Sequence, residues 1–319
     1  MVVGELRRLH AAMAMSRAIE THCVRQSPHW YPSIGEEAVL VGTWSRLRDD
    51  DFAVPHYRGA LIVPWLRGRS VKDVLACVTQ RRSSPTGGRL YGAFAGDVAR
   101  RVMPYVTMVL GPNLGVAAGI AYAYRRQAGD AVAVASLGDG TAGTGDFHES
   151  MNLAAVHHLP VVYVCQNNQL SISTPTAASH AGDSIADWAS RYGMTAERVD
   201  GNDVVAVAAA VDALVEHVRS GRGPGFVEAL TYRVTGHFGA DPAAYRDGAE
   251  AERWIARDPI AAAERALAEQ GVPAPELAAA HAHAAAQVAA AADELAAEPA
   301  LTAADLGAGE VYADAGQRA

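Results

Sequence analysis

The sequence has few cysteines and almost no lysine. Among its 319 residues there are three cysteines, and Lys72 is the one lysine. The cysteines are scattered and lack Cys-x-x-Cys spacing, which argues against a disulfide framework or a cysteine-based zinc module (Cys23, Cys77 and Cys165). Free thiols are typical of a reducing compartment, so we expect a cytoplasmic protein.

Positive charge is also scarce. The formal net charge is −8 at pH 7 and no basic stripe runs along the chain, which argues against a nucleic-acid partner. No signal pattern precedes Leu6, and no uncharged apolar run reaches the ~18 residues of a membrane span, so we expect neither a secretion signal nor a membrane partner. Half of the residues are hydrophobic, which is enough for a substantial core.

What the sequence does have is a sharp turn between a buried strand and a helix. Residues 131–137 form a continuous apolar run, typical of a strand buried on both faces. Gly138, Asp139 and Gly140 follow, and the glycines permit a tight turn and a close approach of phosphate to the backbone. Residues 146–156 then show helical spacing. We expect Asp139 at the carboxyl end of a strand, where open parallel sheets bind ligands.

A second buried strand ends in polar residues. Residues 161–165 are apolar, and Asn168 follows shortly after them. Because neighbouring parallel strands end side by side, Asp139 and Asn168 can share one ion. Mg²⁺ prefers octahedral oxygen ligands, which these side chains, a backbone carbonyl that we assign to Leu170, two phosphate oxygens and a water would supply. Each piece alone is more often an ordinary turn or cap, but together they favour a metal-bound diphosphate.

This region resembles the thiamine-diphosphate motif, and its surroundings resemble one family. They are similar to the α subunit of two-subunit 2-oxo acid dehydrogenases, the decarboxylating component of pyruvate, branched-chain 2-oxo acid and acetoin dehydrogenase complexes. The likeness covers roughly residues 5–312. The segments that carry it are residues 33–38 (SIGEEA), 57–59 (YRG), 145–155 (GDFHESMNLAA), 159–162 (LPVV), 167–175 (NNQLSISTP), 199–203 (VDGND), 231–233 (TYR), 236–237 (GH) and 258–260 (DPI).

The alternation of strand and helix patterns predicts an α/β fold with a doubly wound parallel sheet and helices on both faces, as the resemblance also implies. We expect one diphosphate-binding domain over residues 1–319. It would comprise a helical segment over 1–80, an α/β core over 105–235 with strands near 131–137, 161–166 and 226–232, and a helical segment over 249–319. Ser33 and Glu36 have the spacing of a capping box at a helix start.

The resemblance assigns further residues to the cofactor. It implies that Tyr57 and Arg58 reach the diphosphate, and a guanidinium suits this task because it donates to two phosphate oxygens at once. Arg233 leaves the strand over 226–232 at the same edge, so a phosphate contact is reasonable there too. His237 is implied to lie beside the diphosphate and the reacting centre, which makes it the candidate catalytic residue.

The resemblance also places Met108 and Leu110 at the cofactor's aminopyrimidine ring, held by their backbone and propped by an apolar side chain. The sequence departs from the family in two segments. Residues 87–103 blur the usual glycine-rich pattern, and Phe238 follows His237 where the family often has serine. Trp30 and Tyr31 belong to the stretch where relatives line the substrate pocket.

The implied reaction is decarboxylation of a 2-oxo acid and transfer of the acyl group to a lipoyl carrier on a partner acyltransferase. In this family the glutamate that activates the cofactor comes from a separate β subunit, so we expect an α2β2 heterotetramer and an inactive isolated chain. Two alternatives stay open. One is acyl transfer or carboligation in a biosynthetic pathway without a lipoyl acceptor, and the other is a non-catalytic scaffold with a relic site.

Two histidines near the carboxyl end invite a metal interpretation. His281 and His283 are two residues apart, so on a helix they face different sides. We therefore do not expect this pair to share a metal ion.

Overall fold

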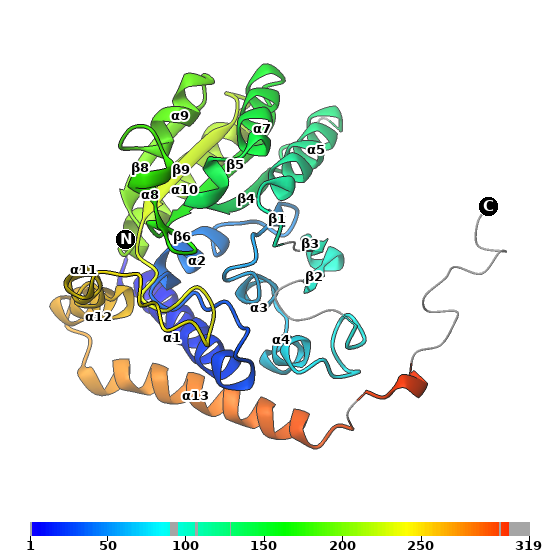
Figure 1. The fold of residues 1–319 in the computed structure, drawn as a ribbon, viewed down its shortest axis with the longest axis vertical. Helices are drawn as coiled ribbons and strands as arrows, with labels where there is room; N and C mark the ends of the chain where they lie inside the picture. Colours follow the sequence, from blue (N-terminus) through cyan, green and yellow to red (C-terminus); the bar gives the residue numbers. More distant parts are fainter. Residues whose placement is uncertain (1, 90–94, 106–107, 128, 300, 306–319) are drawn as a thin grey trace.

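The structure, a computed structural model, describes residues 2–89, 95–105, 108–127, 129–299 and 301–305. Its centre is a seven-stranded sheet in the order β2-β3-β1-β4-β5-β9-β8 (Figure 1). Neighbouring strands from β3 to β8 are parallel, and β2 pairs antiparallel with β3 at one edge. The strands are β1 (Phe52–Val54), β2 (Ala95–Asp97), β3 (Val102–Tyr105), β4 (Ala133–Gly138), β5 (Val161–Asn167), β8 (Thr195–Asp200) and β9 (Gly225–Leu230).

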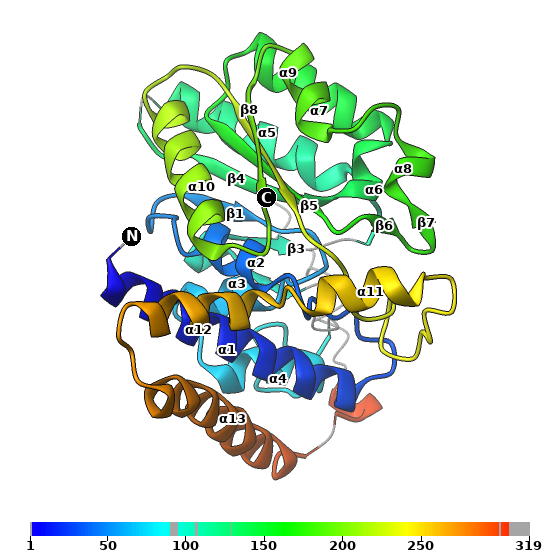
Figure 2. The same ribbon diagram turned by 90° about the vertical axis from the view of Figure 1, so that its left-hand side faces the viewer.

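Helices cover both faces of this sheet and extend beyond it (Figures 1 and 2). They are α1 (Val3–Gln26), α2 (Glu37–Trp44), α3 (Ile62–Leu66), α4 (Val71–Val78), α5 (Pro112–Arg126), α6 (Asp139–Ala142), α7 (Gly145–Val156), α8 (Thr176–Ser179), α9 (Ile185–Arg191), α10 (Val204–Arg219), α11 (Gly248–Ile255), α12 (Pro259–Glu269) and α13 (Ala274–Ala296). A small hairpin pairs β6 (Leu170–Ser171) with β7 (Thr174–Pro175) beyond the end of β5.

The period of two in the central strands decides what each face buries. In β5, Tyr163 points into a cluster with α5, α7 and α9, whereas Val162 and Val164 join α1, α2, α4 and α10 on the opposite side. Both faces are closed to water, so the central strands are apolar throughout. The predicted doubly wound parallel sheet is therefore confirmed.

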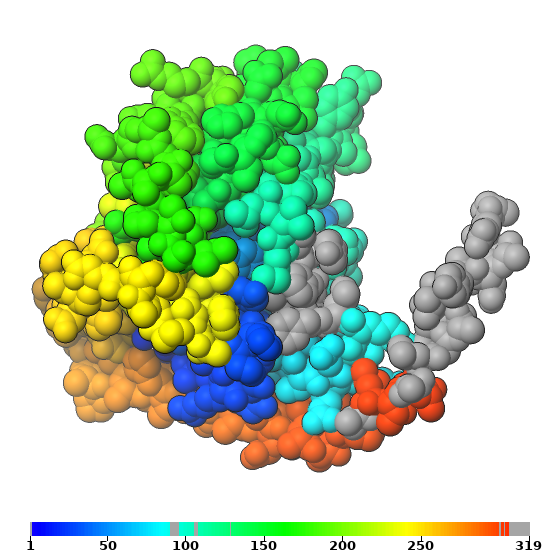
Figure 3. All heavy atoms as spheres, viewed as in Figure 1, coloured from blue at the N-terminus to red at the C-terminus, as the bar shows by residue number. Residues whose placement is uncertain are grey.

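The first and last helices of the described chain pack against each other (Figure 2). Helix α13 lies along α1 and α4, and it forms the lower edge of the molecule in Figure 3. Arg17 of α1 ties the two ends of the chain together, because its guanidinium contacts both Glu37 of α2 and Asp258, the cap of α12. Among the described residues, no helix is both long and apolar enough to cross a lipid bilayer.

The structure adds strands that the sequence analysis missed. Residues 1–80, expected to be helical, also contain β1, which pairs with β4 at the centre of the sheet. This strand has three residues, too few to show a period. Strand β8 was missed because it is an edge strand with mostly exposed, polar side chains.

The expected capping box at Ser33 and Glu36 is wrong. Helix α2 begins at Glu37, and the buried Ser33 hydroxyl has no hydrogen-bond partner. The Glu36 carboxylate turns away from the helix end to accept hydrogen bonds from Gln166 and Asn168. A long-range polar network has replaced the local cap.

Candidate cofactor site

A cavity of about 330 Å³ opens where three neighbouring parallel strands end at their carboxyl edge. Gly138 is the last residue of β4, Asn168 follows β5, and His56 follows β1. This is the edge at which open α/β sheets bind ligands. The cavity is lined by Tyr31, His56, Tyr57, Arg58, Met108, Leu110, Gly138, Asp139, Gly140, Thr141, Asn168, Leu170, Ser171, Ile172 and His237.

Asp139 places a carboxylate on the wall of this cavity. It is the first residue of the short helix α6, and its side chain is buried. Thr176 donates a hydrogen bond to one carboxylate oxygen at 2.6 Å, and burial raises the pKa of the group. The backbone beside it is approachable, because a Cβ on Gly138 would meet no atom within 4 Å. A Cβ on Gly140 would collide with the Ser171 side chain, so the turn also needs glycine for close packing.

Asn168 faces the same cavity with its amide held in one orientation. Its Nδ2 donates to Glu36 Oε1 at 3.1 Å, and its Oδ1 accepts from the Leu170 backbone N–H at 3.3 Å. A carboxylate without a proton only accepts, so Glu36 fixes Nδ2 on its own side and leaves the amide oxygen for other partners. Burial raises the pKa of Glu36, and the nearby Arg58 guanidinium opposes that rise.

His56 extends this network along the strand ends. Its Nε2 lies 2.7 Å from Gln166 Oε1, and Gln166 donates in turn to Glu36. The Arg58 backbone N–H donates to His56 Nδ1, so the ring carries its proton on Nε2. Burial lowers the pKa of His56 to about 4, which leaves it neutral at physiological pH.

Arg58 and His237 form one corner of the cavity. The guanidinium is buried and donates to the Pro32 carbonyl at 2.7 Å and to His237 Nδ1 at 3.2 Å. Tyr57 lies beside them, with the Arg58 guanidinium 5.6 Å from its ring centroid. Tyr31 packs edge-on against both Tyr57 and His237, with ring centroids 5.3 and 5.2 Å away. Burial, with help from Arg58 and Arg233, lowers the pKa of His237 to about 4.

Asp241 organises the loop that carries His237. Its carboxylate accepts hydrogen bonds from the His237 backbone N–H at 2.6 Å, from the Ala243 backbone N–H at 2.9 Å and from the Tyr245 hydroxyl at 2.6 Å. These donors hold the pKa of Asp241 near 2 against the opposing effect of desolvation. The loop is also hydrogen-bonded to the segment between α1 and α2, because the Gly239 N–H donates to the Trp30 carbonyl at 2.7 Å.

Arg233 is the one predicted cofactor residue that does not line the cavity. It is buried behind the wall, where its guanidinium donates to the carbonyls of Leu170 and Ile172 and to the Tyr245 hydroxyl. It therefore joins two segments of the wall, the β6 hairpin and the loop of His237. The Leu170 carbonyl, predicted as a metal ligand, already accepts one of these hydrogen bonds, at 3.2 Å.

The other predicted residues come together. Tyr57, Arg58, Met108, Leu110, Gly138, Asp139, Gly140, Asn168, Leu170 and His237 all line the same cavity. Met108 and Leu110 are each 37% exposed, so they stand at its open side. Sequence reasoning missed the roles of His56, Ser171, Ile172 and Glu36. For Glu36, Ser171 and Ile172 a signal existed, because the family-like segments 33–38 and 167–175 include them.

Fold and cavity together are those of an α/β protein with a ligand-sized cavity at the carboxyl edge of a parallel sheet. Comparison with known proteins shows the family. Residues 7–304 match the family described as dehydrogenase E1 component, and the chain therefore belongs to that family. Members of this family depend on thiamine diphosphate, generally with a divalent metal ion.

Several named relatives are α subunits. The chain is 36% identical to the pyruvate dehydrogenase E1 component subunit alpha of Rhizobium meliloti (strain 1021), over 71% of this chain and 65% of the relative. It is 36% identical to the 3-methyl-2-oxobutanoate dehydrogenase subunit alpha of Mycobacterium tuberculosis (strain CDC 1551 / Oshkosh), over 80% of this chain and 68% of the relative. The 2-oxoisovalerate dehydrogenase subunit alpha of Bacillus subtilis (strain 168) is 36% identical over 71% of this chain and 69% of its own length. The matches thus span about two thirds of these relatives.

Proposed function

We propose that this chain is the α subunit of a thiamine-diphosphate-dependent 2-oxo acid dehydrogenase, which decarboxylates a 2-oxo acid and passes the acyl group to a lipoyl carrier. The observation that carries the proposal is the meeting of Asp139, Asn168, Arg58 and His237 on one cavity wall in a chain of this family. The names of the relatives favour pyruvate, a branched-chain 2-oxo acid or acetoin as the substrate. They favour a dehydrogenase over carboligation.

The residues present fit a diphosphate held through a divalent cation. A buried carboxylate on a cavity wall calls for a positive partner, and Asp139 has one hydroxyl donor, Thr176, as its side-chain partner among the described residues. Asn168 lines the same cavity, and with Nδ2 held by Glu36 its amide oxygen accepts from the Leu170 N–H and can take a further partner. Oxygen donors of this kind suit Mg²⁺, which we propose as the ion. Arg58 would contribute positive charge to the diphosphate.

When bound, thiamine diphosphate supplies a nucleophilic carbon and an electron sink for decarboxylation. The chain's own residues would hold the cofactor in position and polarise the reacting groups. His237 is neutral, and because Nδ1 accepts from Arg58, its proton is on Nε2. It can therefore donate a hydrogen bond from Nε2 to an oxygen that gains negative charge, while its own charge stays unchanged. Met108 and Leu110 would support the apolar part of the cofactor at the open side.

The cavity is chemically incomplete, which supports the proposal of a β subunit. Among the lining residues that the structure describes, Asp139 is the one carboxylate, and in this proposal it binds the cation. The carboxylate that activates the cofactor would come from the partner. Exposed apolar side chains on α5 and α7 support an interface on the face of the sheet that these helices cover, among them Val116, Leu153 and Val156. An α2β2 assembly that delivers to a lipoyl-bearing acyltransferase is the form we propose.

The test uses the chain purified with the β subunit of its own organism. Pyruvate, branched-chain 2-oxo acids and acetoin are supplied with thiamine diphosphate and Mg²⁺, with and without a lipoyl domain. The proposal expects decarboxylation in the pair, none in the isolated chain, and acyl loading of the lipoyl domain. Turnover without any lipoyl loading would reject the dehydrogenase and favour acyl transfer or carboligation without a lipoyl acceptor. Failure to bind thiamine diphosphate would leave a scaffold.

The proposal has two further parts, which concern the domain organisation and the cellular location. We propose that residues 1–319 form a single diphosphate-binding domain, and the shared hydrophobic cluster of α1, α13 and the central strands supports this. We also propose a cytoplasmic location. The three cysteines, which are all free and buried, are compatible with a reducing compartment.

A further inference from the structure

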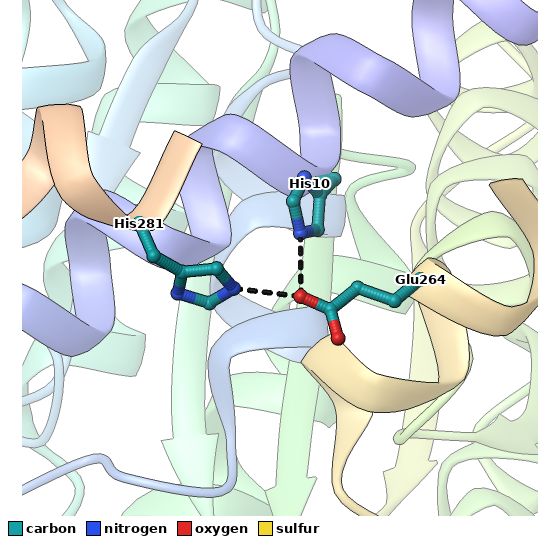
Figure 4. Close-up of side chains that lie close together, drawn as sticks. All are labelled: His10, Glu264 and His281. Atoms are coloured by element: carbon teal, nitrogen blue, oxygen red, sulfur yellow. Dashed lines mark hydrogen bonds and ion pairs between the residues drawn. The ribbon is translucent and has the colours of Figure 1, made fainter. Parts of the chain in front are cut away.

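A histidine, a glutamate and a second histidine meet on the side of the molecule formed by the terminal helices. His10 belongs to α1, Glu264 to α12 and His281 to α13. Figure 4 shows both imidazoles directed at the same carboxylate oxygen. His10 Nε2 lies 3.2 Å from Glu264 Oε1, and His281 Nε2 lies 2.7 Å from that oxygen. None of the three residues lines the cofactor cavity.

We propose that these three side chains form a binding site for a divalent metal ion of the zinc type. Two imidazole nitrogens and a carboxylate oxygen are a donor set that zinc accepts, with a water completing a tetrahedron. The three ligand atoms all lie within 4.8 Å of one another. Zinc bonds of ~2.0–2.1 Å give tetrahedral edges of about 3.3 Å. One edge is already near that length at 3.2 Å, and the other His–Glu edge, at 2.7 Å, is shorter, so side-chain rotations that open it admit the ion.

The proton arrangement of the cluster permits metal binding. In the metal-free state each imidazole directs Nε2 at Glu264 Oε1, and since an ionised carboxylate can only accept, each ring donates from Nε2. A metal ion requires both Nε2 lone pairs, and each ring meets that requirement by carrying its proton on Nδ1 instead. Desolvation raises the pKa of Glu264, but the two histidines lower it by more, so the net pKa is lowered. The carboxylate is therefore ready to bind a cation. Because metal ligands must be free of protons, acid would release the ion.

Burial and access are suited to a bound ion. His10 is 2% exposed and is a preformed ligand, whereas the His281 side chain is 44% exposed and leaves a path from solvent. The rings already stand edge to face, with centroids 5.5 Å apart. The nearby cation Arg7 is paired with Glu276 at 3.0 Å, so its charge is partly neutralised.

The ion would join helices that are distant in the sequence. His10 and Glu264 are 254 residues apart, and the ion would link the first described helix to the last two long ones. A metal that binds the folded chain but not the unfolded chain stabilises it in proportion to the logarithm of its concentration. The site therefore acts as a structural clamp, separate from the cofactor metal.

The experiment is a zinc titration of the full-length chain without a histidine tag and without thiamine diphosphate, followed by calorimetry. We expect one zinc per chain, a raised melting temperature, and a tetrahedral visible spectrum when Co²⁺ replaces zinc. Loss of a ligand should weaken binding by at least about 100-fold, because even partners of metal ligands cost 10–100-fold. His281→Ala is the main variant, since this side chain is half exposed and its loss leaves the core intact.

Two further variants sharpen the result. His283→Ala is the matched control on the same helix, since His283 is exposed and stands outside the cluster, and it should bind zinc like the wild type. Glu264→Gln keeps the size of the side chain and should lose binding. If the wild type binds no zinc, the three residues are a hydrogen-bonded cluster only, and the proposal is overturned. Retention of zinc by His281→Ala would overturn it equally.

Discussion

Arg58 donates a hydrogen bond from Nη2 to Nδ1 of His237 across 3.2 Å. A guanidinium has no acceptor and keeps its charge, so Nδ1 of His237 carries no proton. Burial first, and then the charges of Arg58 and Arg233, lower the pKa of His237 to about 4. The pair therefore fixes both the tautomer and the charge of the candidate catalytic residue: neutral, with its proton on Nε2.

Replacing Arg58 should raise the pKa of His237. We expect Arg58→Gln to move the titration midpoint upward from about 4 by roughly one unit, while burial keeps it below the ordinary value. The measurement is a histidine NMR titration in which His237→Gln assigns the signal. Arg191→Gln, an exposed change on α9, should leave the midpoint unchanged. A wild-type midpoint near the ordinary 6.5 would contradict the proposed neutral state.

Removal of the Asp139 charge should abolish tight cofactor binding. Asn keeps the shape of Asp139 but offers a neutral oxygen to the proposed cation. We expect the affinity of the α–β complex for thiamine diphosphate with Mg²⁺ to fall by about 100-fold or more, since a direct ligand should matter more than its supporting partners. Calorimetry gives the affinity, and Asp187→Asn on the exposed face of α9 is the matched control. Equal affinities would remove Asp139 from the metal site.

Glu36 should control the metal site without touching the ion. It receives Asn168 Nδ2 and Gln166 Nε2 at 3.1 Å each, and this fixes the amide oxygen of Asn168. In Glu36→Gln a neutral amide can also donate, so Asn168 loses its single orientation. We expect Mg²⁺ affinity to fall by roughly 10–100-fold while the fold is kept. Glu149→Gln, an exposed change on α7, serves as the control. If Mg²⁺ affinity is unchanged, Glu36 has no positioning role.

The sequence was informative where a contact follows directly from strand order. Asp139 and Asn168 each follow an apolar strand, and parallel pairing of β4 with β5 is enough to bring them to one edge. Glu36 was misread as a helix cap because its partner Asn168 is 132 residues away, and no local pattern reports such a contact. Asp241 was also missed, although its three donors lie within four residues of it, because no regular turn or cap motif marks the loop that its carboxylate holds.

For Arg233, the sequence predicts the correct edge of the sheet but not the direction in which the side chain points. The strand end did place it beside the site, but its guanidinium supports the wall from behind. We expect Arg233→Met to destabilise the chain by about 2–4 kcal/mol, because buried charge-assisted hydrogen bonds are lost and carbonyls are left unpaired. Arg233→Lys should recover part of that loss. Urea unfolding measures these changes in stability. If either variant binds the cofactor more weakly without any loss of stability, the result would favour a direct contact between Arg233 and the phosphate.

Glu20 should make the stability of the protein depend on pH in an unusual direction. Its carboxylate is buried, and one oxygen accepts from Trp30 Nε1 at 2.6 Å and from the Ser33 backbone N–H at 3.3 Å. Burial raises the pKa of Glu20 from 4.5 to about 7, despite these donors. A carboxyl group with a raised pKa binds more protons in the folded state, so its contribution to stability is complete below pH 4.5 and is lost as the pH rises through about 7.

In Glu20→Gln this dependence should disappear. We expect the free energy of unfolding of the wild type, relative to the variant, to fall by about 1–3 kcal/mol between pH 4.5 and 8, since one pKa unit corresponds to about 1.4 kcal/mol. Urea unfolding at intervals across this range measures the difference. Glu216→Gln on the exposed side of α10 should give a curve parallel to the wild type. A parallel curve for Glu20→Gln as well would show that the buried carboxylate keeps its ordinary pKa, and that Trp30 and Ser33 compensate fully for its burial.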